Sequence, residues 1–237
     1  LCKVPILCID EFGHRCLDCD IIVNPMVDKK YGQYEGSFKK IYIGNQYLVL
    51  PIKYYEWNQR DKKVNTDIQE ITISMGGVDV RNTTQKIVNW LQQINLKTKR
   101  VNIVLGAGYR FSKELKNTIW RKNYFIFHNI NYLDQLFYES DIVFCAGGNT
   151  LHELACIGTA AITIPTMPHE YRNGMAFEEI GFGKCYKGFN EFAEDMTNQF
   201  EIFFNEKRRT QYMYNGKKCS DGGGYLRMLK IIHEALI

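Results

Sequence analysis

The sequence predicts an α/β protein whose main part is a Rossmann-like, doubly wound parallel sheet. Three observations predict it: short apolar runs without polar alternation, segments of helical spacing between those runs, and glycine turns directly after two of them. Strands that are apolar on both faces are typical of parallel sheets covered by helices on either side. Their alternation with helical segments indicates a βαβ series.

Strand and helix candidates alternate through the middle of the chain. The expected strands span residues 71–75, 101–106, 124–127, 141–145 and 160–164. The expected helices span residues 82–95, 112–121, 132–139, 149–157 and 173–180. These elements predict one complete Rossmann-like domain over residues 59–220.

The two ends of the chain follow a different pattern. Residues 1–58 hold two strand candidates, "ILCID" and "DCDIIVN", which are too few for a domain. We expect this part to be an incomplete amino-terminal lobe with its hinge, and the chain to be a piece of something longer. Residues 221–237 read as a glycine turn followed by an amphipathic helix.

Composition is that of an ordinary soluble globular protein. Of the 237 residues, 45% are hydrophobic and 24% charged, and the net charge of +4 is spread along the chain, so nucleic acid is not an expected partner. No apolar stretch approaches the roughly 20 residues that span a bilayer, and no signal peptide is recognisable. Eight cysteines fit a reducing compartment, so we expect a cytoplasmic protein.

Two double-glycine turns follow strand candidates, "SMGGVD" at 74–79 and "CAGGNT" at 145–150. The carboxyl ends of parallel strands share one edge of the sheet, where doubly wound folds bind ligands. A glycine turn that opens a helix offers unpaired N–H groups and a positive dipole end, which favours an anion such as phosphate. Neither turn is GxGxxG or a P-loop, so NAD and ATP sites are not supported and no cofactor is expected.

Glu153 lies just inside the helix that the second turn opens, and two interpretations of it remain. If Thr150 is the N-cap, "TLHE" forms a capping box in which Glu153 only reaches back to a backbone N–H. In the other interpretation, its carboxylate accepts hydrogen bonds from sugar hydroxyls.

A third segment, "IPTMPHEYRNGMAFEEIGFG" at 164–183, places His169, Glu170 and Arg172 near the same edge, before a helix that Asn173 is expected to cap. His152 and His233 are expected to be surface or packing residues. Cys16 and Cys19 form a CxxC near His14, but no second pair accompanies them, so ordinary thiols are expected and no metal site.

These motifs resemble a known superfamily. "SMGGVD", "DIVFCAGGNTLHELACIGTAAITIP" and "NGMAFEEIG" look like the carboxyl-terminal domain of GT-B nucleotide-sugar enzymes, notably the peptidoglycan N-acetylglucosaminyltransferase. "ILCIDEFGHRCLDCDIIVNP", "GNQYLVLPIKYYEW" and "DGGGYLRML" look more like the UDP-sugar hydrolase of pseudaminic acid biosynthesis and its spore-coat polysaccharide relatives.

The resemblance implies a UDP-sugar ligand and assigns residues to it. Glu153 would hold the ribose hydroxyls, and backbone near His128 to Ile130 would read the uracil. His169 is a further candidate for contact with the substrate. The glycine turns would hold the diphosphate through Gly76, Gly77, Gly147, Gly148, Asn149 and Thr150. The terminal helix would cross back to the amino-terminal lobe.

The sequence also departs from the family in two places. A glutamine common before "NGMAFEEIG" has no counterpart, since His169 and Glu170 stand there. The family's catalytic histidine lies on a glycine-rich turn of the first domain, which has no match here, so no catalytic residue is assigned.

Three functions follow as hypotheses. The first is the UDP-sugar-binding part of a hydrolase that releases UDP from a deoxyamino-sugar nucleotide. The second is a GT-B glycosyltransferase that uses a UDP-sugar donor. The third is a non-catalytic donor-binding subunit that pairs with a separate amino-terminal-domain partner.

Overall fold

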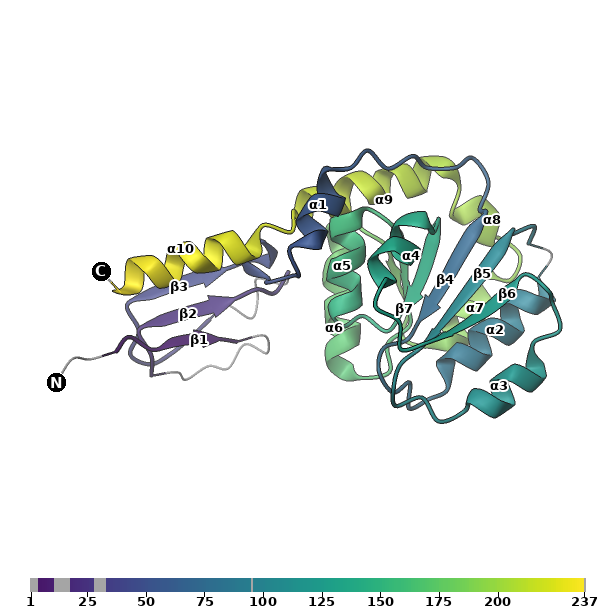
Figure 1. Cartoon of the computed structure of the whole chain (residues 1–237), viewed down its shortest axis with the longest axis horizontal. Coiled ribbons are helices and arrows are strands. Elements are labelled where there is room, and N and C mark those ends of the chain that lie inside the picture. The colour runs from purple at the N-terminus through teal and green to yellow at the C-terminus, as the bar shows by residue number, and fades with distance from the viewer. Residues whose placement is uncertain (1–3, 11–17, 28–32, 95, 237) are drawn as a thin grey trace.

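The computed structural model describes residues 4–10, 18–27, 33–94 and 96–236, and their strands form two parallel sheets. The larger sheet with its helices and the smaller sheet lie side by side along the long axis of the molecule (Figure 1). The first strand, β1, and the last helix, α10, both lie at the smaller sheet (Figure 1).

The larger sheet has the strand order β6-β5-β4-β7-β8-β9. Counted from β4, this is the doubly wound order 3-2-1-4-5-6, in which the direction of winding reverses between the first and fourth strands. All its pairings are parallel, as the unbroken apolar runs predict. The strands are β4 (Glu70–Ser74), β5 (Arg100–Leu105), β6 (Tyr124–His128), β7 (Ile142–Cys145), β8 (Ala160–Thr163) and β9 (Lys184–Cys185).

Helices cover both faces of this sheet. One group packs α4 and α9 against α5, and another packs α7 against α2. The helices are α2 (Thr83–Gln93), α3 (Ser112–Thr118), α4 (Leu133–Glu139), α5 (Asn149–Ile157), α6 (Pro168–Glu179), α7 (Phe189–Met196), α8 (Phe200–Phe203) and α9 (Glu206–Cys219).

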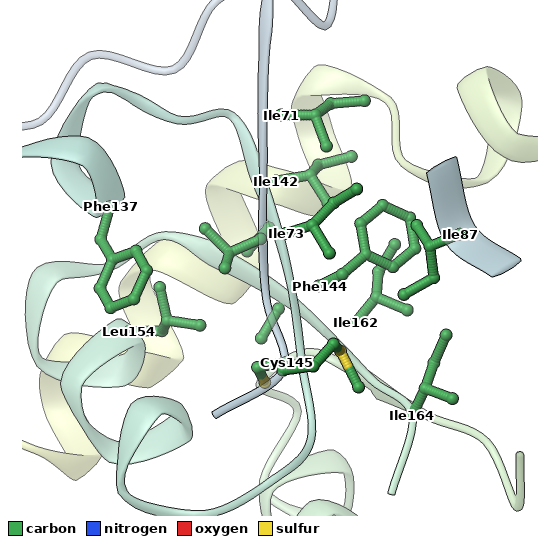
Figure 2. Packing of buried hydrophobic residues seen from close by; sticks show 14 of the residues in the cluster. Ile71, Ile73, Ile87, Phe137, Ile142, Phe144, Cys145, Leu154, Ile162 and Ile164 are labelled. Atoms are coloured by element: carbon green, nitrogen blue, oxygen red, sulfur yellow. The ribbon is translucent and has the colours of Figure 1, made fainter. Parts of the chain in front are cut away.

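The core follows from the two-faced burial of the central strands. Phe137 and Leu154 pack on one side of them, while Phe144 and Ile87 pack on the other (Figure 2). All four side chains are fully buried. Phe144 also contacts the rings of Phe192 and Phe200, so α7 and α8 are fixed to β7 by aromatic packing.

The smaller sheet has three strands in the order β1-β2-β3, with β1 (Leu7–Ile9), β2 (Ile21–Asn24) and β3 (Lys40–Ile43). The terminal helix α10 (Gly224–Leu236) packs on it, so that Met228 and Ile231 meet Ile21 and Val23. The short helix η2 (Asn45–Tyr47) follows β3, and α1 (Lys53–Gln59) leads into the larger sheet.

Three local expectations differ from the structure. The strand β3 was not expected, because "KIYI" is short and its first two residues are exposed. The two-residue strand β9 was also missed. The expected helix 173–180 begins earlier, at Pro168, with Met167 as its N-cap, so the expected capping role of Asn173 is wrong.

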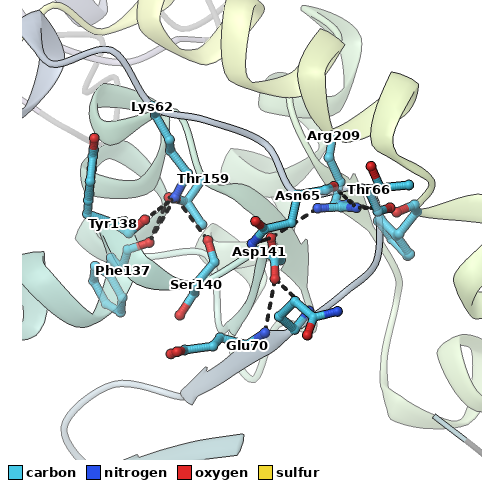
Figure 3. A network of polar contacts seen from close by, with 12 residues as sticks. Lys62, Asn65, Thr66, Glu70, Phe137, Tyr138, Ser140, Asp141, Thr159 and Arg209 are labelled. Carbon is cyan, nitrogen blue, oxygen red and sulfur yellow. Dashed lines mark hydrogen bonds and ion pairs between the residues drawn. The ribbon is translucent and has the colours of Figure 1, made fainter. Parts of the chain in front are cut away.

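A buried polar network joins the segment before β4 to α9 and to the end of α4 (Figure 3). Asp141 accepts hydrogen bonds from the backbone N–H groups of Gln69 and Glu70 at 2.7 and 2.9 Å and pairs with Arg209 at 3.1 Å. Lys62 donates to Ser140 O and Thr159 Oγ1 at 2.9 and 2.7 Å, and burial lowers its pKa to about 7. The network lies at the amino ends of the strands and therefore away from the ligand-binding edge.

Candidate functional site

The two double-glycine turns are neighbours. The strands β4 and β7 that precede them pair directly, with Ser74 opposite Cys145, and the strand order reverses between these two strands. The expectation that both turns meet at one edge is confirmed. This position is the switch point at which doubly wound sheets bind their ligands.

The second turn leads into an open helix end. Gly148 is the N-cap of α5, no side chain caps this helix, and its first turn holds no acidic residue. The capping box built on Thr150 and Glu153 is therefore wrong, since the N-cap Gly148 lies two residues before Thr150. The N–H groups at this end keep their capacity for an anion.

Both glycine turns were expected to hold the diphosphate, but the helix that follows the first turn is capped by a side chain. Both carboxylate oxygens of Asp79 accept hydrogen bonds at 2.8 Å, from the N–H groups of Thr83 and Thr84. The positive end of α2 is therefore already occupied by a carboxylate. Gly76 and Gly77 can meet a ligand only through their own backbone, which the loop at Gly106 supports by close approach.

Glycine is required for different reasons within the second turn. Gly147 has φ +103°, and a Cβ there would lie 2.6 Å from Glu170 O. A Cβ on Gly148 would meet no protein atom within 4 Å, and the φ of −80° lies outside the left-handed region. Protein packing explains Gly147, whereas the space beside Gly148 is open for a ligand.

This difference gives a paired prediction. We expect Gly148→Ala to keep its stability within about 1 kcal/mol of wild type, since only an N-cap preference is lost. The same change should weaken UDP at least about tenfold, because the methyl group occupies the approach to the phosphate. Gly147→Ala should instead destabilise the fold by about 1–3 kcal/mol. Urea unfolding and calorimetric titration with UDP measure both; unchanged UDP affinity in Gly148→Ala would contradict the assignment.

A small cavity adjoins the open helix end. Its volume is about 130 Å³, and it lies between the smaller sheet and the ends of α5 and α6. His169 and Arg172 of α6 line it, and the guanidinium of Arg172 brings a positive charge to the cavity. The other lining residues are Pro25, Met26, Leu48, Gly147, Gly148, Asn149, His152 and Asn173.

Glu170 carries a carboxylate close to the proposed anion site, and a carboxylate beside a phosphate would repel it. In the structure its Oε2 accepts hydrogen bonds from Thr166 N, Thr166 Oγ1 and Met167 N at 2.7–2.9 Å. The carboxylate therefore caps its own helix. It does not line the cavity.

Glu153 lies one turn along α5, outside that cavity. It is half-buried and lies beside Tyr54 of α1, whose hydroxyl favours the charged form of the carboxylate. Burial raises the pKa of its carboxyl, and Lys53 opposes this rise electrostatically. The capping-box interpretation of Glu153 is thus excluded, and contact of its carboxylate with sugar hydroxyls stays a prediction.

His128 is the last residue of β6, and Ile130 lies on the loop between β6 and α4. Lys53 ties this loop to α1, since its Nζ donates to Asn131 O at 3.5 Å and to Asp134 Oδ1 at 2.5 Å. The next residue, Tyr54, reaches Glu153. The first turn of α1 thus holds the 128–134 loop and the Glu153 carboxylate near each other.

Sequence reasoning missed the partners that come from the small sheet and from α1. His152 was expected to be a surface or packing residue, and it is a packing residue: it is buried and hydrogen-bonded on both ring nitrogens, to Asn45 and Asn173. Tyr54 is equally buried. No local pattern marks such residues, because their partners lie about a hundred positions away in the chain.

Comparison with solved structures gives the fold. MurG of Acinetobacter baumannii superposes with a TM-score of 0.63 at 17% identity, over 91% of this chain and 60% of that one. The spinosyn rhamnosyltransferase SpnG in complex with thymidine diphosphate gives a TM-score of 0.58 at 16% identity, over 90% and 57%. The fold is that of GT-B glycosyltransferases. The predicted fold class is confirmed.

Curated proteins also match this GT-B chain. The spore coat polysaccharide biosynthesis protein SpsG of Bacillus subtilis is 23% identical over 97% of this chain and 69% of its own length. A UDP-N-acetylglucosamine–N-acetylmuramyl-(pentapeptide) pyrophosphoryl-undecaprenol N-acetylglucosamine transferase of Finegoldia magna is 27% identical over 84% and 58%. A Helicobacter pylori protein is named as both a pseudaminic acid cytidylyltransferase and a UDP-2,4-diacetamido-2,4,6-trideoxy-β-L-altropyranose hydrolase; it is 27% identical over 58% and 25%. No protein-family model matches.

Other expectations concern metals and membranes. In the described part of this GT-B chain, no group of three His, Cys, Asp or Glu side chains is placed to hold a metal ion. Cys16 and His14 of the CxxC segment lie outside the described residues. Among the described helices, none has both the length and the apolar character to cross a bilayer.

Proposed function

We propose that this chain binds a UDP-sugar and forms the donor-binding part of a glycosyltransferase. The observation that carries the proposal is the uncapped amino end of α5 at the switch point, reached through Gly147 and Gly148. A nucleotide diphosphate needs such a site because aligned N–H groups and the helix dipole offset its charge without a metal ion.

The proposal gives each part of the UDP-sugar a place among the remaining groups. The diphosphate would lie against Gly148, Asn149 and Thr150, with Gly76 and Gly77 on the neighbouring turn. The ribose would lie against Glu153, one turn further along α5. The uracil would meet the backbone between His128 and Ile130, which α1 holds on the same side. His169, in the cavity, would lie toward the sugar.

Transfer is favoured over hydrolysis by the share of this chain that aligns with each relative. The Finegoldia magna transferase aligns with 84% of this chain. The Helicobacter pylori protein that carries a hydrolase name aligns with 58%. Hydrolysis of a deoxyamino-sugar nucleotide is the second candidate, supported by that match. A donor-binding subunit with a separate partner is the third.

Release of UDP tests these proposals. The protein is incubated with UDP-N-acetylglucosamine and with UDP-linked deoxyamino sugars, each with and without a panel of lipid-linked and polysaccharide acceptors. We expect UDP release only when an acceptor is present. Release without an acceptor would support the hydrolase instead. Tight UDP binding without release, together with co-purification of a second protein, would support the donor-binding subunit, and failure to bind UDP would overturn all three.

A further inference from the structure

A line of buried side-chain hydrogen bonds connects the smaller sheet to the second glycine turn. His152 Nδ1 lies 2.6 Å from Asn45 Oδ1, and its Nε2 lies 3.3 Å from Asn173 Nδ2. Asn173 Nδ2 also donates to Gly147 O at 2.6 Å. At the other end, Asn45 Nδ2 donates to Cys219 O at 3.3 Å. We call Asn45, His152 and Asn173 the relay.

Two backbone carbonyls determine the donors and acceptors of the relay. Gly147 O can only accept, so the amide nitrogen of Asn173 must face it, and His152 Nε2 beside that nitrogen must accept as well. Cys219 O likewise requires the amide nitrogen of Asn45, which leaves Asn45 Oδ1 to accept from His152 Nδ1. Both ends therefore require the same imidazole tautomer, neutral with its proton on Nδ1.

Burial keeps the relay in this state. Asn45, His152 and Asn173 are 8%, 4% and 5% exposed. The imidazole also packs edge-on against Phe177, with ring centroids 4.9 Å apart. Desolvation lowers the pKa of His152 to about 4, so the ring stays neutral at ordinary pH. A protonated ring would turn a second N–H toward the Asn173 amide nitrogen and break the line.

The relay ends on the peptide unit that the ligand would meet. In a planar trans peptide, the C=O of Gly147 and the N–H of Gly148 point in opposite directions. Because Asn173 holds the Gly147 carbonyl, the Gly148 N–H is turned away from Asn173, and the space around Gly148 is open. The orientation of this N–H therefore depends on the relay, and the relay depends on Asn45 of the smaller lobe.

We propose that His152 is a positioning residue that orients the Gly148 N–H for the donor phosphate and couples this orientation to the docking of the smaller sheet. The inference rests on the proposed function, because it concerns the same diphosphate site. It adds that the smaller lobe contributes to anion binding through Asn45 without touching the anion.

Variants of His152 test the proposal by calorimetric titration with UDP. His152→Leu removes both hydrogen bonds and should weaken UDP about tenfold, the scale of one oriented hydrogen bond. His152→Gln keeps one donor and one acceptor and should restore most of the affinity. His233→Leu, an exposed histidine on α10, is the matched control and should bind as wild type does. Asn45→Ala repeats the test from the other lobe if His152→Leu does not fold.

The tautomer gives a readout that does not need the ligand. Nitrogen-15 NMR of histidine-labelled wild-type protein should show His152 with its proton on Nδ1 at neutral pH. A proton on Nε2, or equal UDP affinity for wild type, His152→Leu and Asn45→Ala, would overturn the inference while leaving the UDP site intact. Failure of wild type and all variants to bind UDP would instead overturn the proposed function, and the inference with it.

Discussion

Glu153→Ala is expected to weaken UDP binding by at least about tenfold and by up to several powers of ten. Each hydrogen bond from a ribose hydroxyl to the carboxylate is worth about 1.5–3 kcal/mol, and one or two such bonds are lost. A tenfold change in affinity corresponds to about 1.4 kcal/mol. Calorimetric titration of wild type and variant with UDP measures the effect.

The controls separate ribose contact from structural damage. Alanine also removes the polar group beside the Tyr54 side chain, whereas Glu153→Gln keeps a side chain of the same shape with one oxygen and should keep the fold. Glu179→Ala, an exposed glutamate on α6, should leave UDP affinity unchanged. The decisive comparison is UDP against 2′-deoxy-UDP on wild type: equal affinities would show that Glu153 does not hold the ribose.

Arg209→Leu is expected to lower the free energy of unfolding by about 3–5 kcal/mol, the usual result of removing one partner of a buried ion pair. The guanidinium is 2% exposed and donates to Asp141, to Phe204 O at 2.9 Å, and to Asn65 O and Thr66 O at 2.7 and 2.9 Å (Figure 3). Leucine leaves the Asp141 charge buried without its cation and these carbonyls without a donor.

Urea unfolding compares this variant with Arg208→Leu. Arg208 is the next residue toward the start of the chain on the same helix, is exposed, and stacks over Phe203 at 3.8 Å from the ring centroid. Its loss should cost no more than about 1 kcal/mol. If both variants unfold at the same urea concentration, the buried pair does not stabilise the fold as described.

The sequence was sufficient for the larger sheet because local patterns decide it. Each strand from β4 to β8 is an apolar run, and each glycine turn follows its strand within three residues. Parallel topology then places both turns at one edge. The four residues of β3 and the two residues of β9 are too short for such a pattern, and their pairing with neighbouring strands makes them strands.

The site was less predictable because its hydrogen bonds and helix caps depend on tertiary contacts that short sequence patterns do not reveal. "SMGGVD" and "CAGGNT" look alike. However, Asp79 caps the amino end of α2 after the first turn, whereas no side chain caps the amino end of α5 after the second. Glu170 follows His169 in the chain but turns inward to its own helix. His152 has no distinguishing neighbours in sequence, and only the tertiary fold brings Asn45 to it.

The packing of α10 on the smaller sheet has a consequence for the order of events during synthesis. Domains generally begin to fold as they leave the ribosome, starting from the amino end. Here Ile21 and Val23 emerge early but are covered by Met228 and Ile231, after the whole larger sheet has been made. The larger sheet can therefore fold first. The smaller sheet is complete only after α10, which comes from the other end of the chain, has been synthesised and packs on it. Since Pro25, Met26 and Leu48 form one wall of the cavity, that wall is completed only when the last helix docks.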